Sequence, residues 1–397
     1  MKIALINPSY GDKLASFDEM LSRYYHPREL AAALSRYIDE AVWIQGYREE
    51  GDYHVDSIQL KLFKAIPFSG GEQAIMAQHV DDDSLTDAID STKPDHVHIL
   101  GLLPMNILRI SELAAKYTTS ISASFHGGHP SNDPSFFSLQ AQALKRLSVL
   151  LFNAPERAKV WQEAGLISSS TKVAICPETS TFFKLKDRGQ VRSHTGMIGD
   201  PVCVASARLH PIKDPFTLLK GFELILKTKP DAHLYWAYQT DELLLQMKAM
   251  ISTSTQLLNA VHLRGAIDKY EDMEDFFNSA DFFLQASLEE YGGNSLVEAM
   301  ACGALPVVTN IPSFRYLTGD NQFNSLFNTG DAEGLARIVT DLPRNEYPNY
   351  MKGIRDHFDV RLSFDTIART LLNNLNRFQS MSGSPDNTAG KPKTDSA

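Results

Sequence analysis

The sequence lacks most of the features that mark secreted, membrane-spanning or nucleic-acid-binding proteins. Its three cysteines, Cys176, Cys203 and Cys302, match no disulfide or metal-binding spacing, which is typical of reduced thiols inside a cell. A net charge of −10 argues against nucleic acid as a partner. The apolar runs are too short for a signal peptide or a membrane-spanning helix. We therefore expect a cytoplasmic protein, and association with a membrane surface stays open without support from the sequence.

Short apolar runs alternate with helical patterns from end to end, which predicts an α/β fold with parallel strands. The expected strands are 3–6, 42–44, 96–100, 120–124, 146–152 and 173–176 in the first half, and 202–205, 233–237, 261–263, 282–285 and 306–309 in the second. Between the halves, residues 186–200 are polar and lack a hydrophobic period, so we interpret them as a linker. We expect two Rossmann-like domains, 1–188 and 196–380, facing across a cleft, and a disordered tail at 381–397.

The strongest chemical signal is the segment 287–303, which reads SLEEYGGNSLVEAMACG and follows an expected strand. Gly292 and Gly293 let the backbone approach a ligand closely, and the next helix presents free N–H groups to a phosphate. Glu298 lies about one turn inside that helix, among apolar neighbours. A buried carboxylate needs a partner, and the hydroxyls of a ribose would serve, so we favour binding over a solvated helix position.

A second signal lies in the segment 205–215, ASARLHPIKDP, again directly after an expected strand. Arg208 and Lys213 place two cations in this loop just before a helix. A guanidinium grips two phosphate oxygens and an ammonium adds a point charge, so the pair suits a diphosphate. A basic loop with two solvated side chains is the alternative when the segment is taken alone.

Together the Glu290-x7-Glu298 spacing and the Arg208-Leu-x-x-x-Lys213 element resemble the retaining GT-B glycosyltransferases of family 4. The resemblance covers most of the C-terminal half and implies a metal-independent hexosyltransferase of polysaccharide or glycoconjugate biosynthesis. It implies that Glu290 contacts hydroxyls of the donor sugar and that Glu298 binds the ribose. Arg208 and Lys213 would stabilise the leaving diphosphate, whose oxygens would also accept from the backbone of Gly293, Asn294 and Ser295.

The N-terminal half resembles the family only faintly. His126, in the loop after the expected strand 120–124, best matches a family histidine that faces the donor sugar, and His129 is an alternative. The resemblance also suggests donor contacts for Gly11, in the first loop, and for Arg264, near the nucleotide base. Uracil and guanine are not distinguished, so the donor is a UDP- or GDP-sugar and no cofactor is expected.

Three departures from the family pattern leave the acceptor unidentified: the first loop at 8–12, the hinge at 177–181, which reads PETST, and the segment 238–241. They keep open the alternative of a catalytically inactive sugar-nucleotide binder. A nucleotide-sugar epimerase on the same fold is a second alternative, although it would not explain the Arg208 and Lys213 element. The run Asp81-Asp82-Asp83 invites comparison with a metal-binding Asp-x-Asp motif. It precedes a helical pattern, so we interpret it as the acidic start of a helix.

Overall fold

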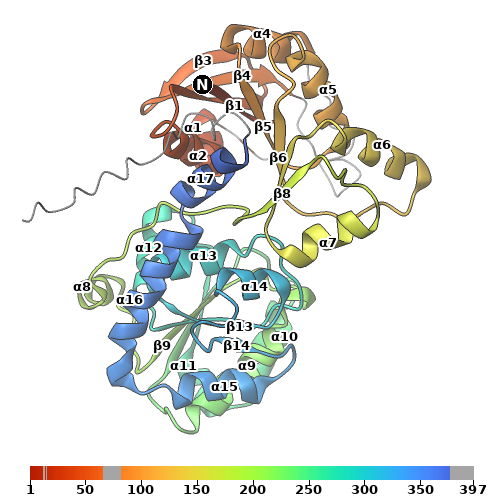
Figure 1. Ribbon diagram of the computed structural model, residues 1–397. Helices are drawn as coiled ribbons and strands as arrows, with labels where there is room; N and C mark the ends of the chain where they lie inside the picture. Colours follow the sequence, from red (N-terminus) through yellow and green to blue (C-terminus); the bar gives the residue numbers. More distant parts are fainter. Residues whose placement is uncertain (12–13, 15, 66–81, 376–397) are drawn as a thin grey trace, which may run out of the picture.

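The computed structural model describes residues 1–11, 14, 16–65 and 82–375 as two α/β units, drawn above and below one another in Figure 1. Each unit is a sheet of mainly parallel strands with helices on its faces. The expected α/β architecture of two Rossmann-like units is confirmed. The expected tail at 381–397, Asp81 and the end of the first loop lie outside the described residues.

The N-terminal sheet has the strand order β3-β4-β2-β1-β5-β6-β7-β8, and its pairings are parallel except that between β3 and β4. Its strands are β1 (Lys2–Asn7), β2 (Glu40–Tyr47), β3 (Gly51–Val55), β4 (Ile58–Lys64), β5 (His96–Leu100), β6 (Ile121–Ser124), β7 (Val149–Phe152) and β8 (Lys172–Ile175). The helices are α1 (Phe17–Arg23), α2 (Tyr25–Leu34), α4 (Asp82–Thr92), α5 (Pro104–Ala114), α6 (Pro134–Leu144) and α7 (Pro155–Glu163). The hairpin of β3 and β4 is not among the elements expected from the sequence.

The C-terminal sheet is parallel throughout, in the order β11-β10-β9-β12-β13-β14. Its strands are β9 (Val202–Ser206), β10 (His233–Ala237), β11 (Val261–Gly265), β12 (Phe282–Gln285), β13 (Leu305–Thr309) and β14 (Leu326–Phe327). The helices are α9 (Pro215–Leu226), α10 (Leu244–Ser252), α11 (Thr255–Ala260), α12 (Tyr270–Asn278), α13 (Asn294–Ala301), α14 (Pro312–Leu317), α15 (Ala332–Asp341) and α16 (Tyr347–His357). This order reverses between β9 and β12, which is where ligands bind in doubly wound sheets.

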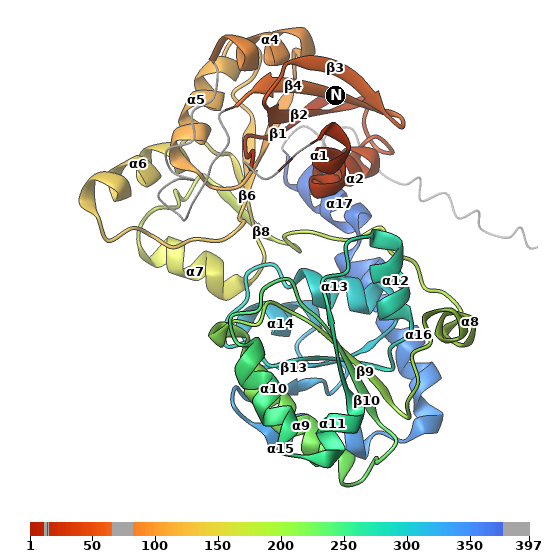
Figure 2. The ribbon, with the colours of Figure 1, turned by 180° about the vertical axis from the view of Figure 1, so that it is seen from behind.

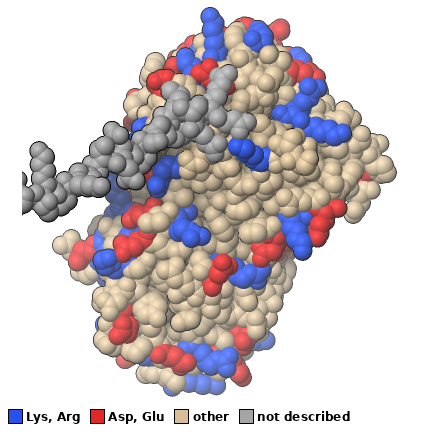
Figure 3. Space-filling model, in the orientation of Figure 1, with Lys and Arg blue, Asp and Glu red and all other residues tan. Residues whose placement is uncertain are grey.

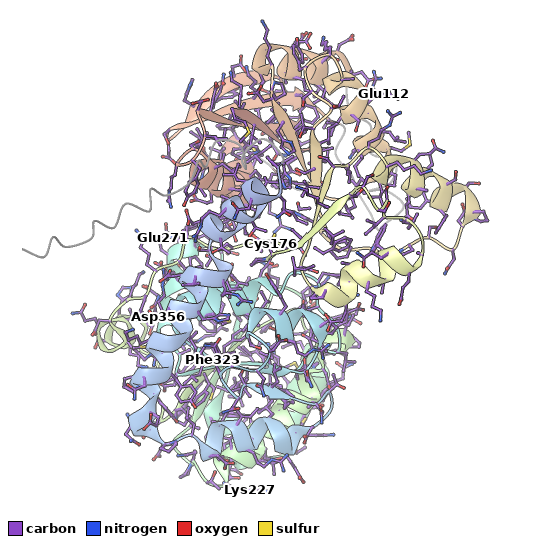
Figure 4. The ribbon with its side chains drawn as sticks, viewed as in Figure 1. Glu112, Cys176, Lys227, Glu271, Phe323 and Asp356 are labelled. Carbon is purple, nitrogen blue, oxygen red and sulfur yellow. The ribbon has the colours of Figure 1, made fainter. Side chains whose placement is uncertain are left out.

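Two connections join the units, as the view from behind shows (Figure 2). The first connection follows β8 and passes through Cys176, which Figure 4 places between the units. It then forms α8 (Arg188–Thr195), which lies within the expected linker. The second returns at the end of the chain, where α17 (Phe364–Asn374) packs into the core of the N-terminal unit. The C-terminal domain proposed from the sequence, 196–380, therefore includes a helix that belongs by its packing to the other unit.

Charged side chains of both signs are interspersed on the face shown in Figure 3. Within the described ranges no helix combines the length and the apolar character needed to cross a membrane.

Gly303 ends α13, the helix that carries Glu298, in a left-handed conformation with φ of 72°. A Cβ there would lie 2.6 Å from Met351 Cγ and 3.1 Å from Leu185 Cδ1. We expect Gly303→Ala to destabilise the protein by about 2–3 kcal/mol, through both the backbone conformation and the overpacking. Thermal denaturation measures this, with Gly165→Ala as the control, because Gly165 has the same backbone conformation in open space. Equal losses in the two variants would contradict the packing part of the explanation.

Candidate active site

The loops that carry the sequence motifs leave the carboxyl ends of β9 and β12, the neighbouring strands at the switch point of the C-terminal sheet. After β9 the chain turns through Pro211–Lys213 and enters α9, capped by Asp214, whose side chain accepts from Thr217 N at 3.2 Å. After β12 it runs through 286–293 and enters α13. Leu288 N donates to Ile212 O at 2.8 Å, so the two loops are bonded directly to each other.

Lys213 and Glu290 form a nearly buried ion pair at the meeting of these loops, with side chains 11% and 13% exposed. Glu290 Oε1 also accepts from Gln285 Nε2 at 2.6 Å and from Ser287 Oγ at 3.0 Å. With Oε1 held by three donors, the orientation of the carboxylate is fixed. The sequence placed Lys213 and Glu290 in one site, whereas Gln285 and Ser287 were missed, although both stand within five residues of Glu290.

Candidate anion-binding groups stand in the same two loops and at the start of α13. Arg208 is exposed, and the described part of the chain gives its guanidinium no hydrogen-bond or ion-pair partner. The first helical residues of α13, Asn294 and Ser295, follow Gly293 in a left-handed N-cap conformation without a side-chain cap. No described residue accepts from the backbone N–H groups of Asn294 and Ser295, so these donors are available to a phosphate.

Glu298 lies one turn further into α13, surrounded by protein but with part of its surface open. Among the described residues nothing donates a hydrogen bond or a salt bridge to its carboxylate. Burial raises its pKa to about 8. Tyr25 and Tyr270 lie nearby. Burial is the main cause of the raised pKa of each tyrosine, and the negative charge of Glu298 raises both pKa values further. The carboxyl group therefore lacks a polar partner among the described residues, and its binding of a ribose stays a prediction.

The two tyrosines also join the units at this wall of the site. Their ring centroids are 5.4 Å apart, and the Tyr270 hydroxyl donates to Ser22 O at 2.7 Å. The Tyr25 hydroxyl donates to Ser180 O, in the hinge, at 3.2 Å. Residues of both units thus surround the position where Glu298 would meet a ligand.

Histidines line the N-terminal wall of the site. His126 Nε2 bonds to Ser124 Oγ at 2.9 Å, and its ring centroid lies 6.0 Å from that of His26. His126 keeps an exposed surface, but the protein atoms crowded around its ring reduce its solvation, which lowers its pKa to about 4. Burial, and to a smaller extent the neighbouring His126 ring, lowers the pKa of His26 to about 3. Both rings are therefore neutral at physiological pH and can hydrogen-bond to uncharged hydroxyls. His26, on α2, was not among the residues expected from the sequence.

Tyr291, between Glu290 and the paired glycines, is held from the N-terminal unit. Its hydroxyl bonds to His129 Nε2 at 2.9 Å, and its ring lies 4.8 Å from the Arg157 guanidinium. Its carbonyl oxygen accepts from Asn153 Nδ2, and its ring packs against Gly127. His129, the sequence alternative to His126, therefore contacts the loop that carries Glu290, and which histidine faces a donor sugar stays a prediction.

Other residues expected in the site lie apart from this cluster. The Arg264 guanidinium lies 5.0 Å above the ring of Tyr235, on the same side of the sheet as His262, so its role in donor binding stays a prediction. The backbone N–H of Gly11 donates to the hydroxyl oxygen of Tyr24, and the contact of Gly11 with a sugar donor also stays a prediction. Asp82 and Asp83 form the first turn of α4, and Asp82 accepts from Arg109 Nε at 2.6 Å. Within the described ranges, no three His, Cys, Asp or Glu side chains are grouped to hold a metal.

The two facing Rossmann-like units define a GT-B fold, and solved structures of that fold match nearly the whole chain. Sucrose-phosphate synthase from Thermosynechococcus elongatus matches with a TM-score of 0.70 at 15% identity, over 96% of this chain and all of that one. The Anabaena protein Alr3699/HepE in complex with UDP-glucose matches with a TM-score of 0.63 at 16% identity, over 95% of this chain and all of that one.

Residues 192–355 match the family model described as glycosyl transferases group 1. Mannosylfructose-phosphate synthase from Agrobacterium fabrum is 31% identical over 141 residues, which are 33% of this chain and 30% of that enzyme. The C-terminal unit is thus similar to the group 1 glycosyltransferases, which is consistent with the family expected from the sequence. The numbered family and the stereochemistry stay predictions.

Proposed function

We propose that this protein transfers a sugar from a nucleoside-diphosphate sugar to an acceptor hydroxyl with retention of anomeric configuration. The observation that carries the proposal is a convergence at one switch point: the fixed Lys213–Glu290 pair, Arg208, which no described residue pairs, and the start of α13. This arrangement offers a carboxylate for sugar hydroxyls beside cationic and dipolar groups for a diphosphate.

In the proposed reaction the bond between the sugar and the diphosphate breaks, and negative charge grows on the departing phosphate. Lys213, Arg208 and the start of α13 would stabilise that charge, and preorganised electrostatics of this kind supplies much of the rate enhancement in many enzymes. Glu290 and His126 orient the donor sugar, and the departing phosphate accepts the proton of the acceptor hydroxyl. Contact of the two units around the site excludes water from the transferred sugar.

UDP-glucose is the donor to test first, because the Anabaena neighbour was solved with it. Several neighbours are synthases of phosphorylated disaccharides, so hexoses and hexose phosphates are the first acceptors. The proposal includes a metal-independent hexosyl transfer in the cytoplasm, serving polysaccharide or glycoconjugate synthesis.

Proton NMR of a reaction with UDP- and GDP-hexoses, acceptor candidates and EDTA tests the proposal. We expect a product with the anomeric configuration of the donor, and at least about tenfold slower turnover in Arg208→Ala, because one leaving-group contact is lost. Unchanged transfer in Arg208→Ala, or a product of inverted configuration, would contradict it.

An epimerase on the same fold is the second candidate, since one observation favours it. Glu178 lies near Glu290 in the site, and acid–base carboxylates are what such a reaction needs. The same NMR experiment separates the two, because an epimerase changes the sugar of the nucleotide without any acceptor. An inactive binder would show neither product.

A further inference from the structure

The hinge segment 177–181, where the sequence departs from the family pattern, reaches into the active site through Glu178. This residue follows β8 and lies where the chain leaves the N-terminal unit. Its Oε2 accepts from Asn153 Nδ2 at 3.1 Å, and the same Nδ2 donates to Tyr291 O. A side-chain bridge thus runs from the hinge, through the end of β7, to the loop that carries Glu290.

The loop is shaped to admit this carboxyl group. A Cβ on Gly292 would lie 3.2 Å from Glu178 Cδ and Oε2, closer than side chains ordinarily approach. A glycine at 292 therefore leaves room for the hinge carboxyl as well as for a ligand. Tyr291, one residue earlier, contacts Arg157 and His129 of the N-terminal unit.

Several charged groups surround Glu178 and its bridge. Burial raises the pKa of Glu178 to about 7, the Asn153 hydrogen bond lowers it, and the charge of Glu290 raises it again. Other titratable groups face the same loop. Lys213 pairs with Glu290 within the C-terminal unit, and Arg157 pairs with Glu289 across the units. His129, in the N-terminal unit, bonds to the Tyr291 hydroxyl. Ionised Glu178 is a stronger acceptor for Asn153 than the neutral acid is.

We propose that Glu178 is a positioning residue for the donor sugar: through Asn153 it holds the Tyr291–Gly292 peptide, so that Glu290 faces the sugar. The inference rests on the proposed function of this site. It assigns a role to a residue of the hinge, where the sequence departs from the family pattern.

The test compares UDP and UDP-glucose in the wild type, Glu178→Ala and Glu178→Gln. Calorimetric Kd values for UDP should stay within about twofold, because Glu178 acts on the sugar side of the site. Turnover of UDP-glucose at pH 8 should fall about tenfold in Glu178→Ala, the factor one charge-assisted hydrogen bond supplies. Glu178→Gln, which keeps an acceptor for Asn153, should lose only about threefold in turnover.

Between pH 6 and 8 the activity of the wild type should rise with the ionisation of a group whose pKa is about 7, and Glu178→Gln should lack that rise.

Two further variants keep the test independent of folding. Asn153→Ala should lose turnover as Glu178→Ala does. The double variant should lose no more than either single variant, because each single substitution already breaks the bridge.

Glu156→Gln is the matched control, because Glu156 pairs with Arg315 across the same boundary without contacting the loop. Wild-type turnover in Glu178→Ala, or additive losses in the double variant, would overturn the inference and leave the transferase proposal standing. Absence of nucleotide binding and turnover in the wild type would overturn both.

Discussion

Replacing Lys213 by alanine is expected to lower turnover of the nucleotide-sugar by about 100-fold or more. The ammonium is one of the charges that would stabilise the departing phosphate, and removal of one such preorganised group typically costs a factor of about 100 to 1,000. The same change leaves Glu290 nearly buried, with Gln285 and Ser287 as its remaining partners among the described residues. We therefore also expect a loss of roughly 3 kcal/mol of folding stability, as when one partner of a buried ion pair is removed.

A paired substitution separates the catalytic loss from the structural one. Lys213→Met combined with Glu290→Gln removes both charges, so denaturation should return close to the wild-type midpoint while turnover stays low. Lys220→Ala is the matched control, because Lys220 is an exposed lysine on the helix that follows the same loop. Turnover within about twofold of the wild type in Lys213→Ala would contradict the assignment of Lys213 to the leaving group.

Replacing Glu298 by glutamine is expected to stabilise the ligand-free protein in alkaline solution by roughly 2–5 kcal/mol, the upper end being the full pKa shift. The pKa of Glu298 is about 8 in the folded protein, above the ordinary value of 4.5. Below pH 4.5 the group is protonated in both states and costs nothing. As the pH rises towards 8 the unfolded chain ionises first, so the wild type loses stability, and above pH 8 the whole penalty is present.

Thermal denaturation at pH 5 and pH 9 measures this difference. The wild type should lose more stability between the two values than Glu298→Gln does, by a few degrees in the midpoint. Glu333→Gln, which changes an exposed glutamate on α15, should behave as the wild type does. Glu178 also titrates in this range, but equally in all three proteins. Parallel pH curves for the wild type and Glu298→Gln would show that Glu298 is not held in an unfavourable environment.

The C-terminal half of the site could be predicted because its chemistry is local in the chain. Glu290, Glu298 and the glycines stand within one strand–loop–helix unit, and Arg208 with Lys213 in another. Two such units on adjacent strands of a parallel sheet meet at the same edge, so their sequence signals predict a shared site.

The N-terminal contribution could not be predicted in the same way. Asn153 and Tyr291 are 138 residues apart, and only the closure of the two units brings them together. Nothing in the local pattern around Asn153 distinguishes it from an ordinary polar residue at the end of a strand. Glu178 did leave a signal, since the hinge was identified as a departure from the family, but no local pattern supplied a physical reason for it.

Some elements were missed because their packing decides their structure. The segment 186–200 is polar, yet α8 forms there between an Asp187 cap and Gly196, and Arg188 and Arg192 both pair with Asp281. The last helix, α17, carries an apolar face whose periodicity predicts a helix but not which unit it covers. Which unit a helix packs against depends on residues far away in the sequence, and helical periodicity does not reveal them.

Calorimetric titration of UDP, GDP and ADP, without metal, into the wild type and Glu298→Ala tests the assignment of the donor site most directly. We predict that one nucleotide binds the wild type with a Kd near 1 µM, about −8 kcal/mol, and binds Glu298→Ala at least about 30-fold more weakly. Equal affinity in the two proteins, or no binding of any nucleotide to the wild type, would contradict a donor site on α13.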